Sequence, residues 1–169
     1  MSIYGYCRIS TAKQSIDRQI RNIKAEYPTA HIVQEAYTGT SIFRPEWLKL
    51  YRVLKAGDTV VFDSVSRMSR NAEEGFALYE DLYHKGIRLV FLKEHHIDTE
   101  TYKKALSGSI AMTGTNVDFI LKGINEYLMA LAKEQIKLAF EQSEKEVADL
   151  HQRTREGLLT ARLNGKQVG

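Results

Sequence analysis

The chain has 169 residues, of which 43% are hydrophobic and 27% charged, so its composition excludes a disordered protein and fits one compact domain with an additional long helix. Its single cysteine, Cys7, excludes an internal disulfide and a cysteine-based zinc cluster within this chain. No apolar run is long enough to span a bilayer, and the N-terminus lacks a basic stretch followed by an apolar signal region. We therefore expect a cytoplasmic protein that does not enter a membrane.

The net charge of +3 is small, but it is unevenly distributed. Residues 1–70 contain 11 Lys and Arg against 6 Asp and Glu, whereas the remaining 99 residues contain 13 against 15. The basic excess therefore lies in the first part of the chain, where a negatively charged partner such as nucleic acid is expected to bind.

The first half of the chain alternates between strand and helix patterns. Strands are predicted at residues 3–8, 31–37, 59–62 and 87–92, and helices at residues 15–27, 45–56 and 71–85. Pro28, Gly57 and Gly86 follow the three helices, Pro45 suits a first helical turn, and Asn71 suits a helix cap. This alternation predicts an α/β fold with a mostly parallel central sheet flanked by helices.

The second half of the chain follows a different pattern. Residues 95–115 suggest a polar loop or short helical pieces, and no fold is predicted there. Residues 117–163 contain no proline and a loosely periodic apolar pattern, which predicts one helix of roughly 40 residues, about 60 Å long. Such a helix must leave the domain, so we expect its apolar stripe to contact a second copy, DNA or both.

We therefore divide the chain into three parts. We expect residues 1–115 to form the α/β domain that carries the candidate catalytic residues described below, residues 116–165 to form the long helix for dimerisation and DNA contact, and residues 166–169 to begin a linker.

A serine and an arginine lie at the end of the first predicted strand. Strand alternation places Tyr6 and Arg8 on one face, and Ser10 follows just past the carboxyl end of the strand. In open α/β sheets ligands bind at this edge. A serine beside a guanidinium there can attack phosphorus, although a serine after a strand is also an ordinary turn residue or helix cap.

More arginines follow the later strands. Arg67 and Arg70 come soon after the strand at 59–62, and a helical turn beginning there would project both to one side. Arg44 follows the loop at residues 38–41. Several preplaced cations can stabilise the charge of a phosphoryl-transfer transition state without a metal. A solvated basic loop is the alternative interpretation.

The residues that other kinds of active site require are not found near these arginines. No histidine lies in these clusters, so a Ser-His-Asp hydrolase has no base, and no phosphate-binding glycine motif occurs. His95 and His96 have no third ligand nearby, so no metal site is predicted. Cys7 lies on the opposite strand face from Arg8 and is expected to be a buried core thiol. Trp47 is expected to pack in the core.

Taken in order, these motifs resemble the signature of the serine recombinases, the resolvase and invertase family. The resemblance rests on Tyr6, Arg8, Ser10 and Gln19, on Gly39 to Ser41 with Arg44, on residues 66–71, and on the QRTREG sequence at 152–157. These motifs are spread over most of the chain, and several motifs in the same order identify a family far more specifically than any single motif does.

The resemblance implies a mechanism of DNA strand exchange. Ser10 would attack the scissile phosphate and become joined to a 5′-phosphate while a 3′-hydroxyl leaves. Arg8, Arg67 and Arg70 would bind the phosphate and stabilise the transition state, with Arg44 assisting. No metal or nucleotide cofactor is implied, because the phosphoserine bond conserves the energy of the diester for religation.

Further residues are assigned supporting roles by the same resemblance. Tyr6, Gln14 and Gln19 would organise the surroundings of the nucleophile, and Arg153 on the long helix would support the site or contact DNA. Ser66 departs from the family pattern, because many members have an aspartate there that could act as an acid or steady the following arginine. The resemblance therefore leaves the proton-transfer partner unassigned.

The implied partners are double-stranded DNA and further copies of the chain, as a homodimer that forms a tetramer when two sites are paired. An insertion between Thr99 and Lys145 relative to small resolvases resembles the large recombinases of mobile elements and conjugative transposons. Family members carry a DNA-reading region after the catalytic domain, so residues 166–169 are expected to lead into one.

Two other functions stay open on the sequence. A catalytically inactive DNA-binding or regulatory module on the same fold would bind DNA without nicking it. A small phosphoesterase would instead hydrolyse small phosphate esters through Ser10.

Overall fold

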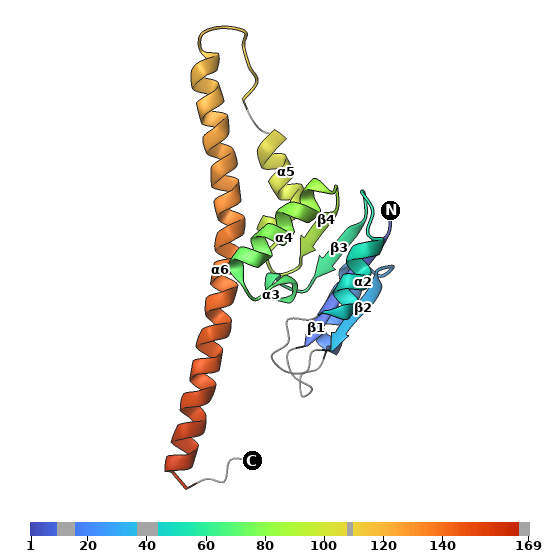
Figure 1. The fold of residues 1–169 in the computed structure, drawn as a ribbon, viewed down its shortest axis with the longest axis vertical. Helices are drawn as coiled ribbons and strands as arrows, with labels where there is room; N and C mark the ends of the chain where they lie inside the picture. The colour runs from blue at the N-terminus through green and yellow to red at the C-terminus, as the bar shows by residue number, and fades with distance from the viewer. Residues whose placement is uncertain (10–15, 37–43, 108–109, 166–169) are drawn as a thin grey trace.

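The computed structural model describes residues 1–9, 16–36, 44–107 and 110–165, and it is an α/β domain with a long helix along one side (Figure 1). Four strands form a parallel sheet in the order β2-β1-β3-β4. The strands are β1 (Ile3–Ile9), β2 (His31–Ala36), β3 (Thr59–Phe62) and β4 (Arg88–Phe91). The predicted α/β class and all four predicted strands are therefore confirmed.

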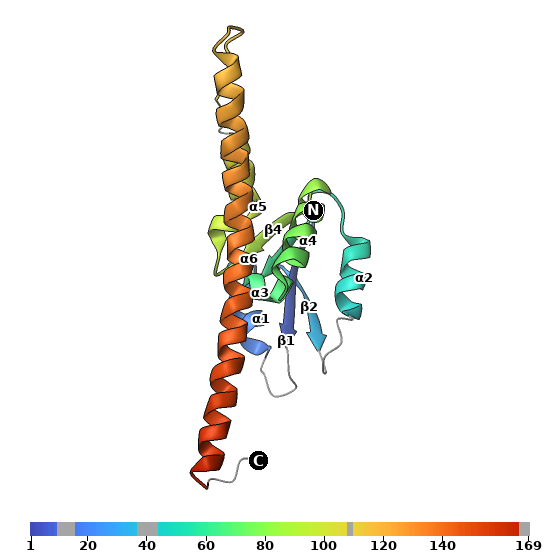
Figure 2. The same cartoon turned by 60° about the vertical axis from the view of Figure 1, so that its left-hand side comes forward.

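Helices connect the strands and cover both faces of the sheet. They are α1 (Asp17–Glu26), α2 (Pro45–Val53), α3 (Val65–Met68), α4 (Ala72–His84), the 3₁₀ helix η1 (His95–Ile97), α5 (Thr99–Ser107) and α6 (Asp118–Leu163). Figure 2 shows α1 and α2 on opposite sides of the strands. Parallel strands buried on both faces explain the continuous apolar runs of β3 and β4.

The two faces of the sheet bury separate apolar cores. Cys7 packs with Ile23 of α1 in the smaller core, whereas Tyr6 packs in the larger core on the opposite face. Trp47 lies in that larger core, with its ring centroid 5.1 Å from that of Tyr6. The buried thiol and the core tryptophan expected from the sequence are both present.

Local signals explain where two helices begin. Pro45 occupies the first turn of α2, where a backbone N–H would have no partner within the helix, so the lack of one in proline costs no hydrogen bond. The side chain of Asn71 accepts a hydrogen bond from the backbone N–H of Glu74 and caps α4 as predicted.

Residues 95–107, for which no fold was predicted, form η1 and α5 and close one edge of the sheet. The side chain of Asp98 accepts a hydrogen bond from the Phe91 N–H at 2.7 Å, and the Thr99 hydroxyl accepts one from the Leu89 N–H at 2.9 Å. Side chains thus accept hydrogen bonds from N–H groups of β4 that would otherwise pair with a further strand, and β4 remains at an edge of the sheet.

The long helix predicted for residues 117–163 is confirmed as α6. It has 46 residues, and both of its ends extend past the domain in Figure 1. Only its middle is buried, where Ile136, Ala139 and Phe140 join the larger core. A Cβ on Gly75 of α4 would lie 2.5 Å from the Phe140 ring, so glycine is what allows α4 and α6 to approach closely. None of the described helices combines the length and apolarity needed to cross a membrane.

Phe140→Ala is expected to lower the free energy of unfolding by about 3 kcal/mol, because it removes a fully buried ring and leaves a cavity against Gly75. Phe119→Ala on the same helix is the matched control, since Phe119 is 83% exposed and its loss should change stability by less than about 0.5 kcal/mol. Urea denaturation of the two variants measures both values. Equal losses would mean that α6 does not dock through Phe140.

Candidate active site

The site lies at the carboxyl end of β1 and β3, where Arg8 is held by its backbone. The N–H of Arg8 donates to Oε1 of Gln19 at 3.1 Å, and Nε2 of Gln19 donates to the Arg8 carbonyl at 2.9 Å. Gln19 is 3% exposed and reaches β1 from α1, so it fixes the last residues of the strand before the predicted nucleophile. Ser10, Gln14 and the predicted loop at 38–41 lie outside the described residues.

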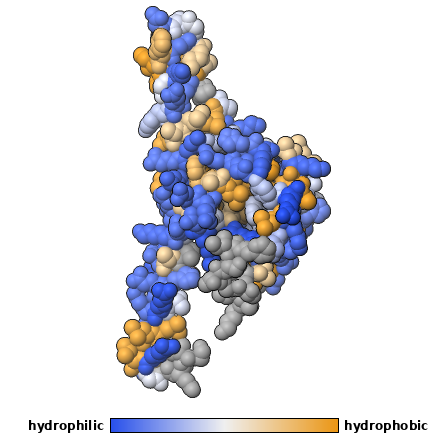
Figure 3. Space-filling view, viewed as in Figure 1, coloured by the Kyte–Doolittle hydropathy of each residue, from blue (hydrophilic) through white to orange (hydrophobic). Residues whose placement is uncertain are grey.

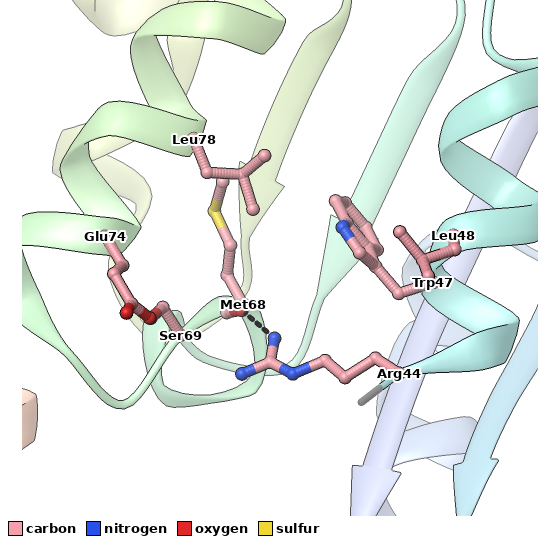
Figure 4. Close-up of a pocket in the computed structure, with 7 residues that line it drawn as sticks. All are labelled: Arg44, Trp47, Leu48, Met68, Ser69, Glu74 and Leu78. Carbon is pink, nitrogen blue, oxygen red and sulfur yellow. Dashed lines mark hydrogen bonds between the residues drawn. The ribbon is translucent and has the colours of Figure 1, made fainter. Parts of the chain in front are cut away.

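Three arginines bind backbone carbonyls around this strand end. A terminal nitrogen of Arg8 donates to the Ser66 carbonyl at 2.7 Å, and Nη1 of Arg67 donates to the Arg8 carbonyl at 3.3 Å. Arg44 donates to the Met68 carbonyl, a bond drawn in Figure 4. Because α3 starts soon after β3, its backbone supplies the carbonyls that hold Arg8 and Arg44 at this edge, whereas the end of β1 supplies the carbonyl that holds Arg67.

The cluster concentrates positive charge. Burial, followed in that order by the neighbouring Arg44, Arg70 and Arg67, lowers the pKa of Arg8 to about 9. Arg8 is only 5% exposed. Within the described ranges none of these arginines forms an ion pair with a carboxylate. A bound anion would relieve the mutual repulsion, so the arrangement is suited to holding a phosphate group.

Arg70 does not lie on the helical turn that was expected to project it beside Arg67. The predicted helical turn includes Arg67, but α3 ends at Met68 and Ser69 has an extended backbone with ψ of 156°. Arg70 therefore reaches the cluster after an extended residue and not along a helical face. It is still close enough to lower the pKa of both Arg8 and Arg67.

The supporting residues fall into two groups. Tyr6 is buried below Arg8, and burial, followed by the adjacent Glu35 carboxylate, raises its pKa far above the ordinary value. Ser66 lies in α3, with its hydroxyl oxygen 2.6 Å from that of Ser64. Arg153, in contrast, is exposed on α6, and no described hydrogen bond or ion pair links it to the other arginines. The structure brings the first two toward the cluster but not Arg153.

Glu35 is a buried carboxylate to which the sequence assigned no role. It is 2% exposed, and its Oε2 accepts hydrogen bonds from the N–H groups of Glu46 and Trp47, each at 3.0 Å. A carboxylate at a helix N-terminus satisfies unpaired donors and is stabilised by the helix dipole. Glu35 thereby fixes the start of α2, and with it Arg44, beside Tyr6.

A pocket of about 230 Å³ opens beside Arg44. Figure 4 shows its lining, which comes from α2 on one side and from α3 and α4 on the other. The lining residues are Arg44, Trp47, Leu48, Met68, Ser69, Glu74 and Leu78. It is mostly apolar, so phosphate binding is better served by the guanidinium cluster than by this pocket.

A second residue missed by the sequence analysis is Asp63, which directly follows β3. Its side chain is fully buried, and its Oδ1 accepts a hydrogen bond from Nδ2 of Asn22 at 2.8 Å. An aspartate immediately after an apolar strand, at the edge that carries the arginines, is the signal that could have found it. Among the described residues no group of three or more His, Cys, Asp and Glu could hold a metal ion.

Fold and site together define a parallel α/β domain with a cluster of arginines at the carboxyl edge of its sheet. The family model described as "Resolvase, N terminal domain" matches residues 3–136. The chain therefore belongs to the resolvase family, whose serine catalytic domain carries out site-specific DNA recombination, and the family implies DNA binding.

The chain is similar to several known proteins. The chain is 28% identical over 169 residues to a "Resolvase" of Clostridium perfringens, covering 99% of this chain and 75% of that protein. It is 27% identical to the "Transposon Tn21 resolvase" of Escherichia coli, covering 90% of this chain and 83% of the relative. A crystal structure of a resolvase family site-specific recombinase from Streptococcus pneumoniae aligns with a TM-score of 0.48 and 19% identity, covering 96% of this chain and 98% of that one.

Proposed function

We propose that Ser10 is the nucleophile of this recombinase. Its hydroxyl oxygen attacks the scissile phosphorus, a new serine O–P bond forms, and the bond to the 3′-oxygen breaks. The serine hydroxyl gives up its proton and the leaving 3′-oxygen takes one up, so the DNA strand stays joined to the protein through a 5′-phosphoserine. Attack by a 3′-hydroxyl of the partner strand reverses these bond changes and rejoins DNA without a cofactor.

The observation that carries this proposal is the convergence of Arg8, Arg44, Arg67 and Arg70 at the edge where β1 ends. Arg8 is two residues before Ser10, so its guanidinium group belongs to the strand that leads directly to the proposed nucleophile. They would bind the non-bridging oxygens of the phosphate and stabilise the added charge of the transition state. Tyr6 and Gln19 would hold the strand end, Gln14 and Ser66 would complete the surroundings, and Arg153 would contact DNA.

The direct test is to identify the covalent intermediate. A protein containing this chain is incubated with DNA carrying the recombination site of its own element, and the reaction is stopped with detergent. We expect a protein–DNA adduct whose peptide map places the phosphodiester on Ser10. Tight DNA binding with neither nicks nor adduct would favour an inactive regulatory module. Turnover of small phosphate esters without an adduct would favour a phosphoesterase.

We further propose that α6 pairs with a second copy of the chain, and that two dimers form a tetramer on paired sites. Apolar side chains gather toward both ends of the helix in Figure 3. Phe119, Leu159 and Leu163 are 83%, 59% and 79% exposed. Large apolar side chains on a long helix are stabilised when a partner covers them, so we expect a second copy to do so. Sedimentation velocity should show a dimer that Leu159→Ser with Leu163→Ser weakens at least tenfold; a monomer at micromolar concentration would contradict the proposal.

Two finer assignments accompany the proposed reaction. Residues 1–115 would form the catalytic unit and 116–165 the helix that serves dimerisation and DNA contact, with residues 166–169 leading toward a DNA-reading region. The chain would belong to the large recombinases of mobile elements that act in the cytoplasm. The relatives named above are resolvases, so the full gene sequence is the test: a short helix-turn-helix after residue 169 would contradict the large type.

A further inference from the structure

The short helix α3 supplies the hydrogen-bond acceptors that hold two of the arginines. The Ser66 carbonyl accepts a hydrogen bond from a terminal nitrogen of Arg8 at 2.7 Å, and the Met68 carbonyl accepts one from Arg44, as Figure 4 shows. A side chain is held only as precisely as the groups that support it. The placement of α3 therefore decides where both guanidinium groups point.

This helix has only four residues, and its first N–H groups have no acceptor within it. Ser64 stands in the N-cap position, where a serine oxygen ordinarily accepts from the first turn. Among the described residues, however, its side chain makes no capping hydrogen bond, and its hydroxyl oxygen lies 2.6 Å from that of Ser66. The local sequence therefore does not fix the start of α3.

The acceptor for the first turn of α3 comes from Glu94, just past β4. Its Oε2 accepts a hydrogen bond from the N–H of Val65, the first residue of α3, at 3.0 Å. A carboxylate at a helix N-terminus forms a charge-assisted bond and is favoured by the helix dipole. The side chain of Val65 is buried in the larger core, so the bonded residue is fixed on its other side as well.

Glu94 is itself held at both ends of its backbone. Its N–H donates to the Phe91 carbonyl at 3.0 Å, and its carbonyl accepts from the Ile97 N–H at 3.0 Å. Phe91 is the last residue of β4 and Ile97 the last of η1, and both side chains are fully buried. The side chain of Glu94 thus reaches α3 from a backbone that is anchored to the sheet.

We propose that Glu94 is the positioning residue of α3, which it fixes so that the carbonyls of this helix hold Arg8 and Arg44 in place. Glu94 acts through the reach of its oxygen to the Val65 N–H and not through its charge. The inference rests on the proposed function of the two arginines as phosphate ligands.

Two substitutions of Glu94 separate reach from charge. Glu94→Gln keeps the length and an acceptor oxygen but removes the charge. Glu94→Asp keeps the charge but is shorter by one carbon, about 1.5 Å, and should no longer reach Val65. Positioning predicts that the aspartate is defective and the glutamine is not. If Glu94 were only a negative charge near the arginines, the glutamine would tighten phosphate binding and the aspartate would leave it unchanged.

The experiment is a titration of the 169-residue chain with inorganic phosphate, followed through the backbone ¹⁵N–¹H resonances. We expect Glu94→Asp to weaken phosphate binding about tenfold, the effect of losing one hydrogen bond to a charged group, and Glu94→Gln to stay within about twofold of wild type. The Val65 N–H should shift and exchange faster with solvent in Glu94→Asp alone. Equal phosphate affinities of the two variants, or an unchanged Val65 resonance in Glu94→Asp, would overturn the proposal.

Asp58→Ala is the matched control, because Asp58 also accepts backbone hydrogen bonds beside β3 but at the opposite end of the strand. Its carboxylate bonds the N–H groups of Ser2 and Lys55 at 2.8 and 2.9 Å. This variant should lose stability, while the folded chain keeps its affinity for phosphate. If it weakened phosphate binding as much as Glu94→Asp does, general loosening of the domain would explain both results and the positioning role would be wrong.

Arg8→Gln distinguishes the two ways of failing. If it leaves phosphate binding unchanged, the proposed function of Arg8 as a phosphate ligand is wrong. If it weakens binding whereas Glu94→Asp does not, only the positioning role of Glu94 is wrong. Where both roles hold, Glu94→Asp should cost less in the Arg8→Gln background than in wild type, because part of its effect passes through Arg8. An undiminished cost there would contradict the positioning role.

Discussion

Ser10→Ala is expected to abolish the covalent protein–DNA adduct and to reduce strand cleavage by a factor of about 10⁴ or more. Removing a nucleophile eliminates the bond-forming step, and the groups that remain only bind and stabilise charge. DNA binding should be almost unaffected, because the positive charges that contact phosphate all remain. The measurement is detergent-resistant adduct over time, with a filter or gel assay for binding of the same DNA.

Ser107→Ala is the control for this substitution. Ser107 is exposed at the end of α5, and its hydroxyl donates to the Lys104 carbonyl one turn earlier, so adduct formation should be unchanged. Adduct formation by Ser10→Ala at more than about 1% of the wild-type rate would show that another residue attacks the phosphate. Equal loss of adduct and DNA binding would instead point to a structural role for Ser10.

Much of the fold follows from local signals in the sequence. The sheet was predictable because β3 and β4 are short apolar runs between glycine, proline and asparagine signals that end or begin helices. The length of α6 followed from 46 residues without proline. Residues 95–107 could not be assigned, because η1 and α5 are held by the long-range bonds of Asp98 and Thr99 to β4, which leave no local pattern.

The site was predictable to a lesser degree. The edge that carries Arg8 and Arg67 follows from strand order, because residues after parallel strands meet at one end of the sheet. The mutual arrangement of the side chains does not. Arg70 approaches after an extended residue, and Glu35 and Asp63 act through contacts with elements distant in sequence. Such contacts depend on packing between layers and have no periodic signature.

The central place of Arg8 in the cluster leads to the second prediction. Arg8→Gln should reduce adduct formation by about 10³, because it removes the guanidinium nearest in sequence to the nucleophile from a site that stabilises phosphate charge. The folded domain should not lose stability in parallel. Burial, and after it three neighbouring arginines, lowers the pKa of Arg8 to about 9, so a neutral side chain there avoids the cost of a buried charge and relieves repulsion, which offsets the lost bond to Ser66.

Urea denaturation in phosphate and in chloride of equal ionic strength tests both parts of this argument. A ligand that binds only the folded state raises the free energy of unfolding, so phosphate should stabilise the wild-type chain more than chloride does. Arg8→Gln should be at least as stable as wild type in chloride and should lose most of the phosphate effect. Arg88→Gln is the matched control, because Arg88 lies at the start of β4, is exposed and pairs with Glu100.

The control should keep the full phosphate effect, which separates binding at the cluster from the general action of phosphate on the protein surface. If Arg8→Gln instead lost about 2 kcal/mol or more in chloride, Arg8 would be a structural residue whose buried bond to the Ser66 carbonyl outweighs the repulsion. If it kept the phosphate effect, the anion would bind elsewhere. We therefore expect low activity with undiminished stability. In a binding site built from mutually repelling charges, the same charges that stabilise a bound anion destabilise the folded protein without it.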